Sequence, residues 1–179
     1  MVTNVITAIR ATRGVAVVEL ALVLPLLLLL ILGMADFGKA MNAWIDETHL
    51  ATEGARLAAV DYKPTSGYPA CTGTDTTGGL GCYIQRGADI GELQTGRKGD
   101  SYAPQQNGVK VCISFPNVGN ATPLVGDPVR VTVSVDYQWL RYITARLGAL
   151  TTTVVGTATM RLEQVPSNYT SGCYTTAAP

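Results

Sequence analysis

The stretch RGVAVVELALVLPLLLLLILGMA, residues 13–35, decides how this chain is organised. From Val15 to Ala35 there are twenty-one residues, and Glu19 is the only one that carries a charge. A helix that crosses a membrane needs about 20 apolar residues. The segment therefore predicts one membrane-spanning helix with a carboxylate near its N-terminal end.

The apolar side chains of this segment outweigh its single charge. Nine Leu, four Val and one Ile contribute roughly −4 to −8 kcal/mol to membrane insertion. A carboxylate costs at most about +3 kcal/mol at the bilayer centre and less near the edge, where Glu19 lies. Insertion is therefore favourable. Pro25 lies inside the segment and removes one backbone donor, so we expect it to bend or loosen the helix locally.

The charges that flank the apolar segment predict its orientation. Arg10 and Arg13 precede it without any acidic residue, whereas both acidic and basic residues follow it. The positive-inside bias places the N-terminus in the cytoplasm and everything after Ala35 outside. The chain is thus predicted to consist of a cytoplasmic leader (1–14), a transmembrane segment (15–35), a helical extension (36–62) and an outer domain (63–179).

Helical periodicity continues beyond Ala35. Apolar and small residues recur at steps of three and four, which predicts an amphipathic helix. One face of this helix is expected to consist of Phe37, Met41, Trp44, Ile45, Thr48, Ala51, Ala55 and Ala58. Its alanines would pack either on another helix or on the chain's own sheet. Pro64 disfavours helical backbone at Lys63 and marks the end of the helix. The expected element is one helix of about 45 residues that is partly in lipid and partly outside it.

The outer domain contains β-strand patterns. Strands are predicted at residues 109–115, 129–137 and 151–162, with a bulge at Gly156. Residues 63–107 are typical of a long loop with a short helix near Ile90, and residues 139–147 predict another short helix. The tail from Ser167 is expected to be loose except at Cys173. The predicted fold class is α+β: a long membrane-spanning helix followed by a small antiparallel, disulfide-bonded domain.

All four cysteines, Cys71, Cys82, Cys112 and Cys173, lie beyond the apolar segment. In an oxidising compartment an even number of cysteines predicts two disulfides. Three pairings exist, and the sequence alone does not choose among them. We favour Cys71–Cys82, which closes a short Gly/Thr-rich loop, and Cys112–Cys173, which ties down the tail. A zinc site fits poorly, because there is no C-x-x-C pair and the one histidine lies on the predicted helix.

Composition and motifs argue against several classes of protein. The formal net charge is zero and Lys and Arg are scattered, so no nucleic-acid-binding surface is predicted. A single histidine without a nucleophile at motif spacing argues against a catalytic triad. The glycines at 78, 79 and 81 lack the lysine of a phosphate-binding loop. We therefore expect neither an enzyme nor a protein that needs a metal or other cofactor.

Several blocks of this sequence resemble the TadE-like pseudopilins of tight-adherence (Flp-type) pilus systems. The blocks are Arg13-Gly14, Val18–Pro25 with its poly-Leu continuation, Asp36–Lys39, Glu53–Val60 and a later strand that ends in Ala158–Glu163. Two features depart from the family. Leu20 follows the glutamate where the family often has Phe, and many members lack cysteines, so the resemblance does not explain the outer domain.

The resemblance implies a minor, pilin-like component that supports assembly of a pilus or a related secretion machine. A prepilin peptidase would cut between Gly14 and Val15, where the absence of a side chain lets the enzyme approach the backbone. The new α-amine has a pKa near 8 and is cationic at neutral pH. Glu19 of one subunit could neutralise the amine of its neighbour, which makes it a register device, and Pro25 would be a local packing feature.

The resemblance also implies location and partners. The protein would be a single-pass component of the bacterial inner membrane, with the outer domain periplasmic or extracellular. Its partners would be the prepilin peptidase, other pilins or pseudopilins, the inner-membrane assembly platform and membrane lipid. A position at the tip, in the shaft or only in the basal platform of the pilus is left open by the sequence.

Two other functions stay open at this point. Cleavage after Ala35 would release a secreted, disulfide-bonded binding module, and no cleavage would leave an anchored accessory protein of the envelope. The apolar segment is longer than the 7–15 residues usual in a secretory signal, which argues against the first of these. The mature N-terminus separates the three functions, because it would be Val15, Asp36 or Met1.

Overall fold

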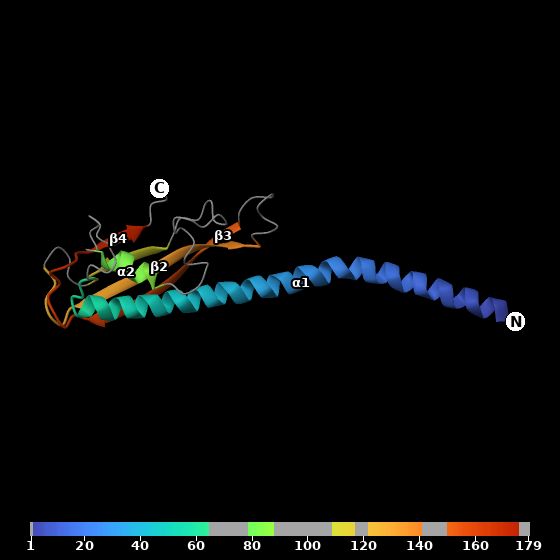
Figure 1. The fold of residues 1–179 in the computed structure, drawn as a ribbon, viewed down its shortest axis with the longest axis horizontal. Helices are drawn as coiled ribbons and strands as arrows, with labels where there is room; N and C mark the ends of the chain where they lie inside the picture. Colours follow the sequence, from blue (N-terminus) through green and yellow to red (C-terminus); the bar gives the residue numbers. More distant parts are fainter. Residues whose placement is uncertain (1, 65–78, 88–108, 117–121, 141–149, 176–179) are drawn as a thin grey trace. The chain divides into compact units, whose positions relative to one another are not determined.

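A computed structural model describes residues 2–64, 79–87, 109–116, 122–140 and 150–175 (Figure 1), with side chains from Val15 onward in the first of these ranges. The chain divides into two compact units, Met1–Lys39 and Ala40–Pro179. The first unit is helical, and the second contains the rest of that helix, a short helix and a four-stranded sheet. The α+β fold predicted from the sequence is confirmed.

Helix α1 (Val2–Ala59) is the long N-terminal helix expected from the periodicity, and its backbone also includes the leader residues. Leucine and alanine, which favour helix, dominate most of its length. Pro25 lies inside the helix. The ribbon bends within the blue part of α1 (Figure 1), which contains this residue. A proline in a helix interior removes one i→i−4 hydrogen bond and is a common cause of such bends.

Asp61 terminates α1 before Pro64 is reached. Its φ of 52° lies in the left-handed region, which aspartate tolerates better than most residues. The N–H of Asp61 donates to the carbonyl of Ala58 (3.2 Å), and the N–H of Tyr62 donates to that of Leu57 (3.0 Å). This is a Schellman motif, which satisfies carbonyls that the helix end would leave unpaired. The stop is therefore set by the left-handed residue, with proline following it.

Four antiparallel strands form one sheet in the order β3-β2-β1-β4. The strands are β1 (Lys110–Ser114), β2 (Pro128–Trp139), β3 (Leu150–Arg161) and β4 (Gly172–Thr175). The first three match predicted strands. The last corrects the expectation of a loose tail, because four residues are too few to show a strand pattern in the sequence.

A disulfide joins the interior strand β1 to the edge strand β4. Cys112 and Cys173 are paired residues of these strands, with Cα atoms 4.0 Å apart, and they form the bond favoured from the sequence. Cys82 is also disulfide-bonded. Its predicted partner, Cys71, lies outside the described residues.

The core lies between one face of the sheet and the part of α1 that belongs to the second unit. The helix contributes mainly small side chains to it, and the sheet contributes the alternate valines of β2 (Val129, Val131, Val133 and Val135), all of them buried. At Gly156 of β3, a Cβ atom would lie 2.5 Å from the backbone carbonyl carbon of Glu47. Only glycine permits this approach of helix backbone to strand backbone.

Gly156 is therefore not the bulge that the sequence predicted. The register of β2 and β3 runs without interruption from Pro128 opposite Arg161 to Trp139 opposite Leu150. Glycine is needed here because the helix backbone occupies the space in which a Cβ atom would lie. The strand has no extra residue at this position. A glycine in a strand can mark either a bulge or a close approach of another backbone, and the sequence does not distinguish the two.

Helix α2 (Leu80–Arg86) is the one short helix in the described part of the outer domain. It begins ten residues before Ile90, where the sequence predicted a short helix. Ile84 of α2 packs on α1, since a Cβ on Gly54 would lie 2.7 Å from its Cδ1 atom. Ile90 and most of the helix predicted at 139–147 lie outside the described residues, while Trp139 belongs to β2.

The C-terminal segment is fastened to the end of α1. The Asp61 carboxylate accepts hydrogen bonds from the backbone N–H groups of Ser167 (3.0 Å) and Asn168 (3.1 Å) and from both of their side chains. Burial raises the pKa of Asp61, but these hydrogen bonds outweigh it and leave the pKa below its ordinary value. The Tyr169 hydroxyl donates to the carbonyl of Ala58 (2.6 Å). The tail is thus ordered by polar contacts that connect residues over a hundred positions apart.

Candidate functional site

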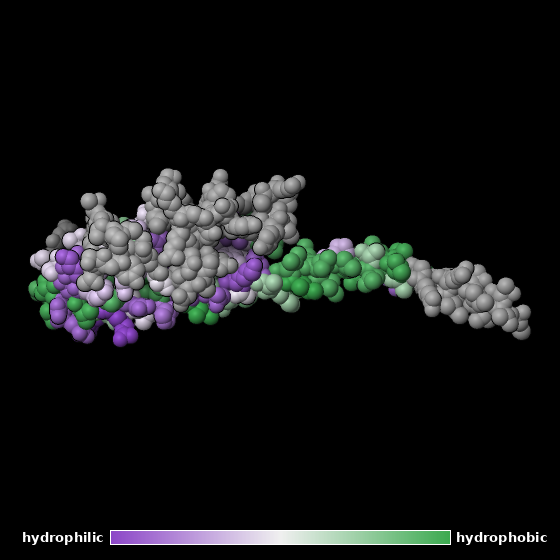
Figure 2. All heavy atoms as spheres, viewed as in Figure 1, coloured by the Kyte–Doolittle hydropathy of each residue, from purple (hydrophilic) through white to green (hydrophobic). Residues whose placement is uncertain are grey.

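The first unit presents an apolar helix surface with no covering from the described residues. None of the residues in its most apolar part is buried, and α1 is long and apolar enough to cross a membrane by length and composition. Figure 2 shows nearly continuous hydrophobic surface along this stretch of the helix on the face in view. Leu22 is 75 % exposed and Leu26 is 65 % exposed. Exposed apolar surface of this extent marks a contact with lipid or with other protein.

The predicted residues of the N-terminal site all lie on α1. Gly14 and Val15 are consecutive within the helix, and the exposed Glu19 follows Val15 by four residues, about one helical turn. Pro25 lies further along the same exposed segment. The arrangement thus places a carboxylate close to the backbone position at which a new N-terminus would form.

The apolar surface of α1 continues beyond Ala35. Phe37, Trp44 and Ile45 are 58 %, 48 % and 59 % exposed, and Met41 is 40 % exposed. These four residues belong to the apolar face predicted from the sequence, and they lie on the side of the helix that faces away from the sheet, called the open side below. The sheet is instead faced by smaller residues, Ala40 and Ala43 among them, because the close approach at Gly156 leaves no room for large side chains. The large side chains therefore lie on the open side.

The same predicted face is buried farther along the helix. Ala51, Ala55 and Ala58 are fully buried against the sheet. Alanine fits the close contact between helix and sheet, so this part of the predicted face packs on the sheet while the large residues from Phe37 to Ile45 stay exposed.

Glu47 is a buried carboxylate within the helix–sheet contact. Its side chain has no exposed surface, and neither of its carboxylate oxygens has a hydrogen-bond partner. Burial, and after it the charge of Asp46, raises the pKa of Glu47 to about 8. The group is therefore mostly protonated at neutral pH, because a buried unpaired charge is costly.

Glu47 is not among the functional residues predicted from the sequence. Asp46-Glu47 has the composition of an ordinary solvated acidic pair. The position of Glu47 along the helix does indicate burial, because Glu47 lies four residues from both Ala43 and Ala51, which are fully buried. Residues four apart share a helix face.

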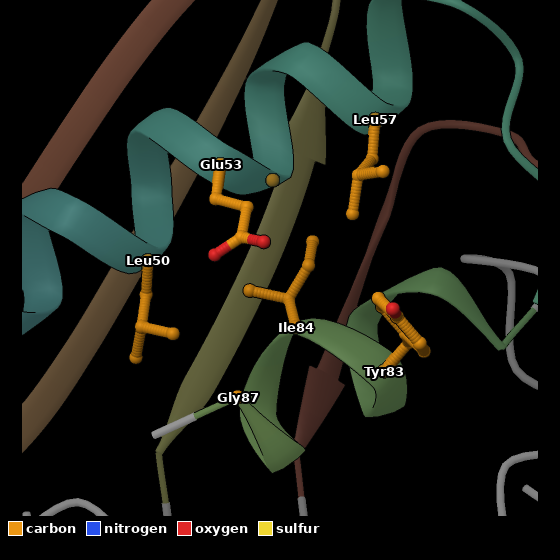
Figure 3. A pocket seen from close by; sticks show the side chains of 7 residues that line it. Leu50, Glu53, Leu57, Tyr83, Ile84 and Gly87 are labelled. Carbon is orange, nitrogen blue, oxygen red and sulfur yellow. The ribbon is translucent and has the colours of Figure 1, made fainter. Parts of the chain in front are cut away.

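A small pocket of about 110 Å³ lies between α1 and α2. Figure 3 shows Leu50, Glu53 and Leu57 on the α1 side and Tyr83 and Ile84 on the α2 side. Glu53 is the one carboxylate among these residues, and it is exposed. The pocket offers an apolar recess with a single acidic group at its mouth.

A wider, open groove of about 690 Å³ follows the end of α1 and the end of β3. Its charged lining residues are Glu53, Arg56, Arg161 and Glu163. The two arginines and two glutamates balance one another, so the groove has no strong preference for ligand charge. The described linings of both cavities lack a nucleophile next to a base, which acyl transfer of the triad type would require.

One part of this chain matches a known protein family. Residues 14–56 match the family described as TadE-like protein, which confirms the resemblance found in the sequence. The match starts at Gly14, crosses the exposed apolar segment and ends at Arg56, within the part of α1 that packs on the sheet. No characterised protein and no solved structure matches the chain.

The buried Glu47 carboxylate predicts how stability depends on pH. The unfolded chain releases this proton near the ordinary pKa of 4.5, whereas the folded protein keeps it up to about pH 8. Between these values the folded state binds more protons, so stability falls by up to about 1.4 kcal/mol per pH unit as pH rises. Glu47→Gln stays neutral and should therefore unfold at a higher temperature than the wild type at pH 8, with little advantage at pH 4.5.

Thermal unfolding of the full-length protein in detergent, followed by circular dichroism, measures this difference. Glu53→Gln is the matched control, because it makes the same substitution at an exposed position of the same helix. An advantage of Glu47→Gln that is equal at both pH values would contradict a protonated Glu47.

Proposed function

We propose that this chain, whose residues 14–56 match the TadE-like family, is a pseudopilin, or minor pilin, that supports assembly of a tight-adherence (Flp-type) pilus or a related secretion machine. One observation carries the proposal. The family match begins at Gly14, immediately before an exposed apolar helix of membrane-spanning length. The role is structural, and the chemistry of processing and of assembly lies in the partners.

Processing would occur between Gly14 and Val15. The bond lies within the backbone of α1, so a peptidase must unwind the helix locally to reach it. Glycine costs about 1 kcal/mol relative to alanine inside a helix and leaves the peptide bond open to close approach. Both properties suit a cleavage position. The partner for this step is a prepilin peptidase, and the product is a helix that starts at Val15.

The new N-terminus would pair with Glu19. The α-amine of Val15 is cationic at neutral pH, and the carboxylate of Glu19 is exposed about one turn away. Either charge alone is costly in lipid, whereas an ion pair between neighbouring subunits is tolerated. The pair would set the register in which one anchor helix packs on the next. Pro25 would contribute a bend to the same packing surface.

The exposed apolar side of α1 supports contacts with other subunits. The surface of the anchor segment is joined by Phe37, Met41 and Trp44 beyond Ala35, and none of these side chains is needed in the core of the outer domain. In the membrane this surface would contact lipid. During assembly it would contact the helices of other pilins and of the inner-membrane platform, which exchanges lipid contacts for protein contacts.

The location that follows is the bacterial inner membrane, crossed once. Arg10 and Arg13 favour a cytoplasmic N-terminus, which places the disulfide-bonded domain in the periplasm or outside the cell. Cleavage after Ala35 would instead release the domain as a secreted binding module. The family match argues against this, because it runs through Ala35 without a break and includes residues on both sides.

Replacement of Gly14 by valine tests the cleavage position. Gly14→Val should leave an inserted protein that is longer by the leader, because insertion depends on the Leu-rich segment and cleavage on the missing side chain. Immunoblotting of membrane fractions measures both size and insertion. Gly14→Ala is the matched control and should be cut at least in part. Normal processing of Gly14→Val would remove the basis for a prepilin-type site.

Replacement of Glu19 tests the assembly step separately. Glu19→Ala should insert and be cleaved, but it should assemble poorly because the amine of a neighbour loses its partner. The measurements are pilus number per cell and co-purification with partner pilins. Val18→Ala, which shortens the adjacent side chain without a change of charge, is the control. Wild-type assembly by Glu19→Ala would reduce Glu19 to an incidental residue.

A further inference from the structure

The strand β3 forms an open edge of the sheet. It pairs with β2 along all twelve of its residues, and the strand order β3-β2-β1-β4 places no described strand on its other side. An edge strand presents backbone N–H and C=O groups that can pair with a strand of another chain. The twelve-residue length makes this edge much longer than the four-residue edge strand β4.

The groups that point outward from β3 can be assigned from one hydrogen bond. The N–H of Leu162 donates to the carbonyl of Asp127, and these two residues continue the β2–β3 register. In an antiparallel pair, bonded and non-bonded pairs alternate. Even-numbered residues of β3 therefore bond to β2. The backbone groups of Thr151, Thr153, Val155, Thr157 and Thr159 point to the open edge, and their side chains are exposed on the outer face.

Most of β3 itself lacks the residues and the bulge that usually prevent pairing at an edge. Natural edge strands are blocked by proline, by lysine or other charges, or by a bulge. From Leu150 to Met160 β3 contains no proline and no charged residue, and its register has no bulge. From Thr151 to Thr159 the outward row consists of four threonines and one valine, which favour β structure, and the charged Arg161 ends the row. An edge of this composition is suited to receive a strand.

The topology indicates which strand can pair with it. Every neighbouring pair in the four-stranded sheet is antiparallel, so β3 and β4 run in opposite directions. A second copy of the chain that has the same orientation therefore brings its β4 antiparallel to β3. We infer that β3 of one copy pairs with β4 of a second copy, so that the sheets of neighbouring subunits join edge to edge.

The partner edge has backbone groups in the required positions. Successive residues of an interior strand bond alternately to the two neighbouring strands. Applied first to β2 and then to β1, this alternation makes Val111 and Ile113 the residues of β1 that bond to β4. The short Cα–Cα distance of 4.0 Å between Cys112 and Cys173 agrees with a non-bonded pair. The N–H and C=O groups of Cys173 and Thr175 thus point away from β1. These two residues can pair with two outward residues of β3.

A shared membrane supports this choice of partner, and the inference rests on the anchoring proposed above. Anchored copies have their outer domains on the same side of the membrane, where the sheet edges of neighbouring copies can meet. Contacts between different edges do not close into a dimer but continue from copy to copy, as a filament requires. Anchoring also raises the effective concentration of the domains, so a short strand contact suffices.

Photo-crosslinking of the full-length protein in the membranes of producing cells tests the inference. Benzoylphenylalanine at Thr159 should give a covalent dimer of the chain, and mass spectrometry should place the link within residues 171–175 of the second copy. The same probe at Ser134, on the outer face of the interior strand β2, is the control and should give no dimer. Membrane fractionation and the size of the processed chain are recorded on the same cells.

A second variant tests the backbone hydrogen bonds. Thr157→Pro removes an outward N–H without removing a bond to β2, as edge strands allow. It should lower the yield of dimer roughly tenfold, which corresponds to about 1.4 kcal/mol, whereas Thr157→Ala keeps the N–H and should leave the yield unchanged. Resistance of the outer domain to protease shows that both variants are folded.

The outcomes separate the inference from the proposed function. A chain that is anchored and processed but gives no dimer from Thr159 overturns the edge pairing alone. A link to β3 of the second copy, or to a different protein, overturns the choice of partner strand. A chain that is absent from the membrane fraction removes the proposed function and the inference together.

Discussion

The outer domain depends on the close approach of helix α1 to strand β3. The backbone of Glu47 lies where a side chain of Gly156 would be, and alanines fill most of the rest of the contact. Small side chains let the helix lie low on the sheet, and the valines of β2 complete the core beneath it. Any larger residue at Gly156 would have to displace helix backbone and not a flexible side chain. This one contact therefore determines which face of α1 is buried and which is open.

Two properties of α1 follow from that contact. The open face keeps large apolar residues, Phe37, Trp44 and Ile45, which continue the apolar surface of the anchor beyond the membrane-length segment. The buried face includes Glu47, whose carboxylate has no partner. A group of this kind lowers stability when it ionises, so the helix–sheet contact is strongest when Glu47 is protonated. The end of the helix is held independently, by the hydrogen bonds between Asp61 and the C-terminal segment.

Much of this architecture could be predicted from the sequence because the signals are local. The length of the apolar segment, the alternation in Val129–Tyr137 and the even number of cysteines each depend on neighbouring residues. The features that were missed depend on residues far apart. Strand β4 exists because Cys173 pairs with Cys112, and the ordered tail exists because Ser167 and Asn168 reach Asp61. The burial of Glu47 and the role of Gly156 depend on where helix and strand meet, which local patterns do not contain.

The proposed processing makes Val15 the first residue of a helix that stays in the membrane. Intact-mass and N-terminal peptide analysis identifies the first residue of the wild-type protein, purified from membranes of cells that contain a prepilin peptidase. We expect a mature chain that begins at Val15. A chain that begins at Asp36 would identify a secreted domain, and one that begins at Met1 would identify an unprocessed anchor; either result would overturn the proposed processing.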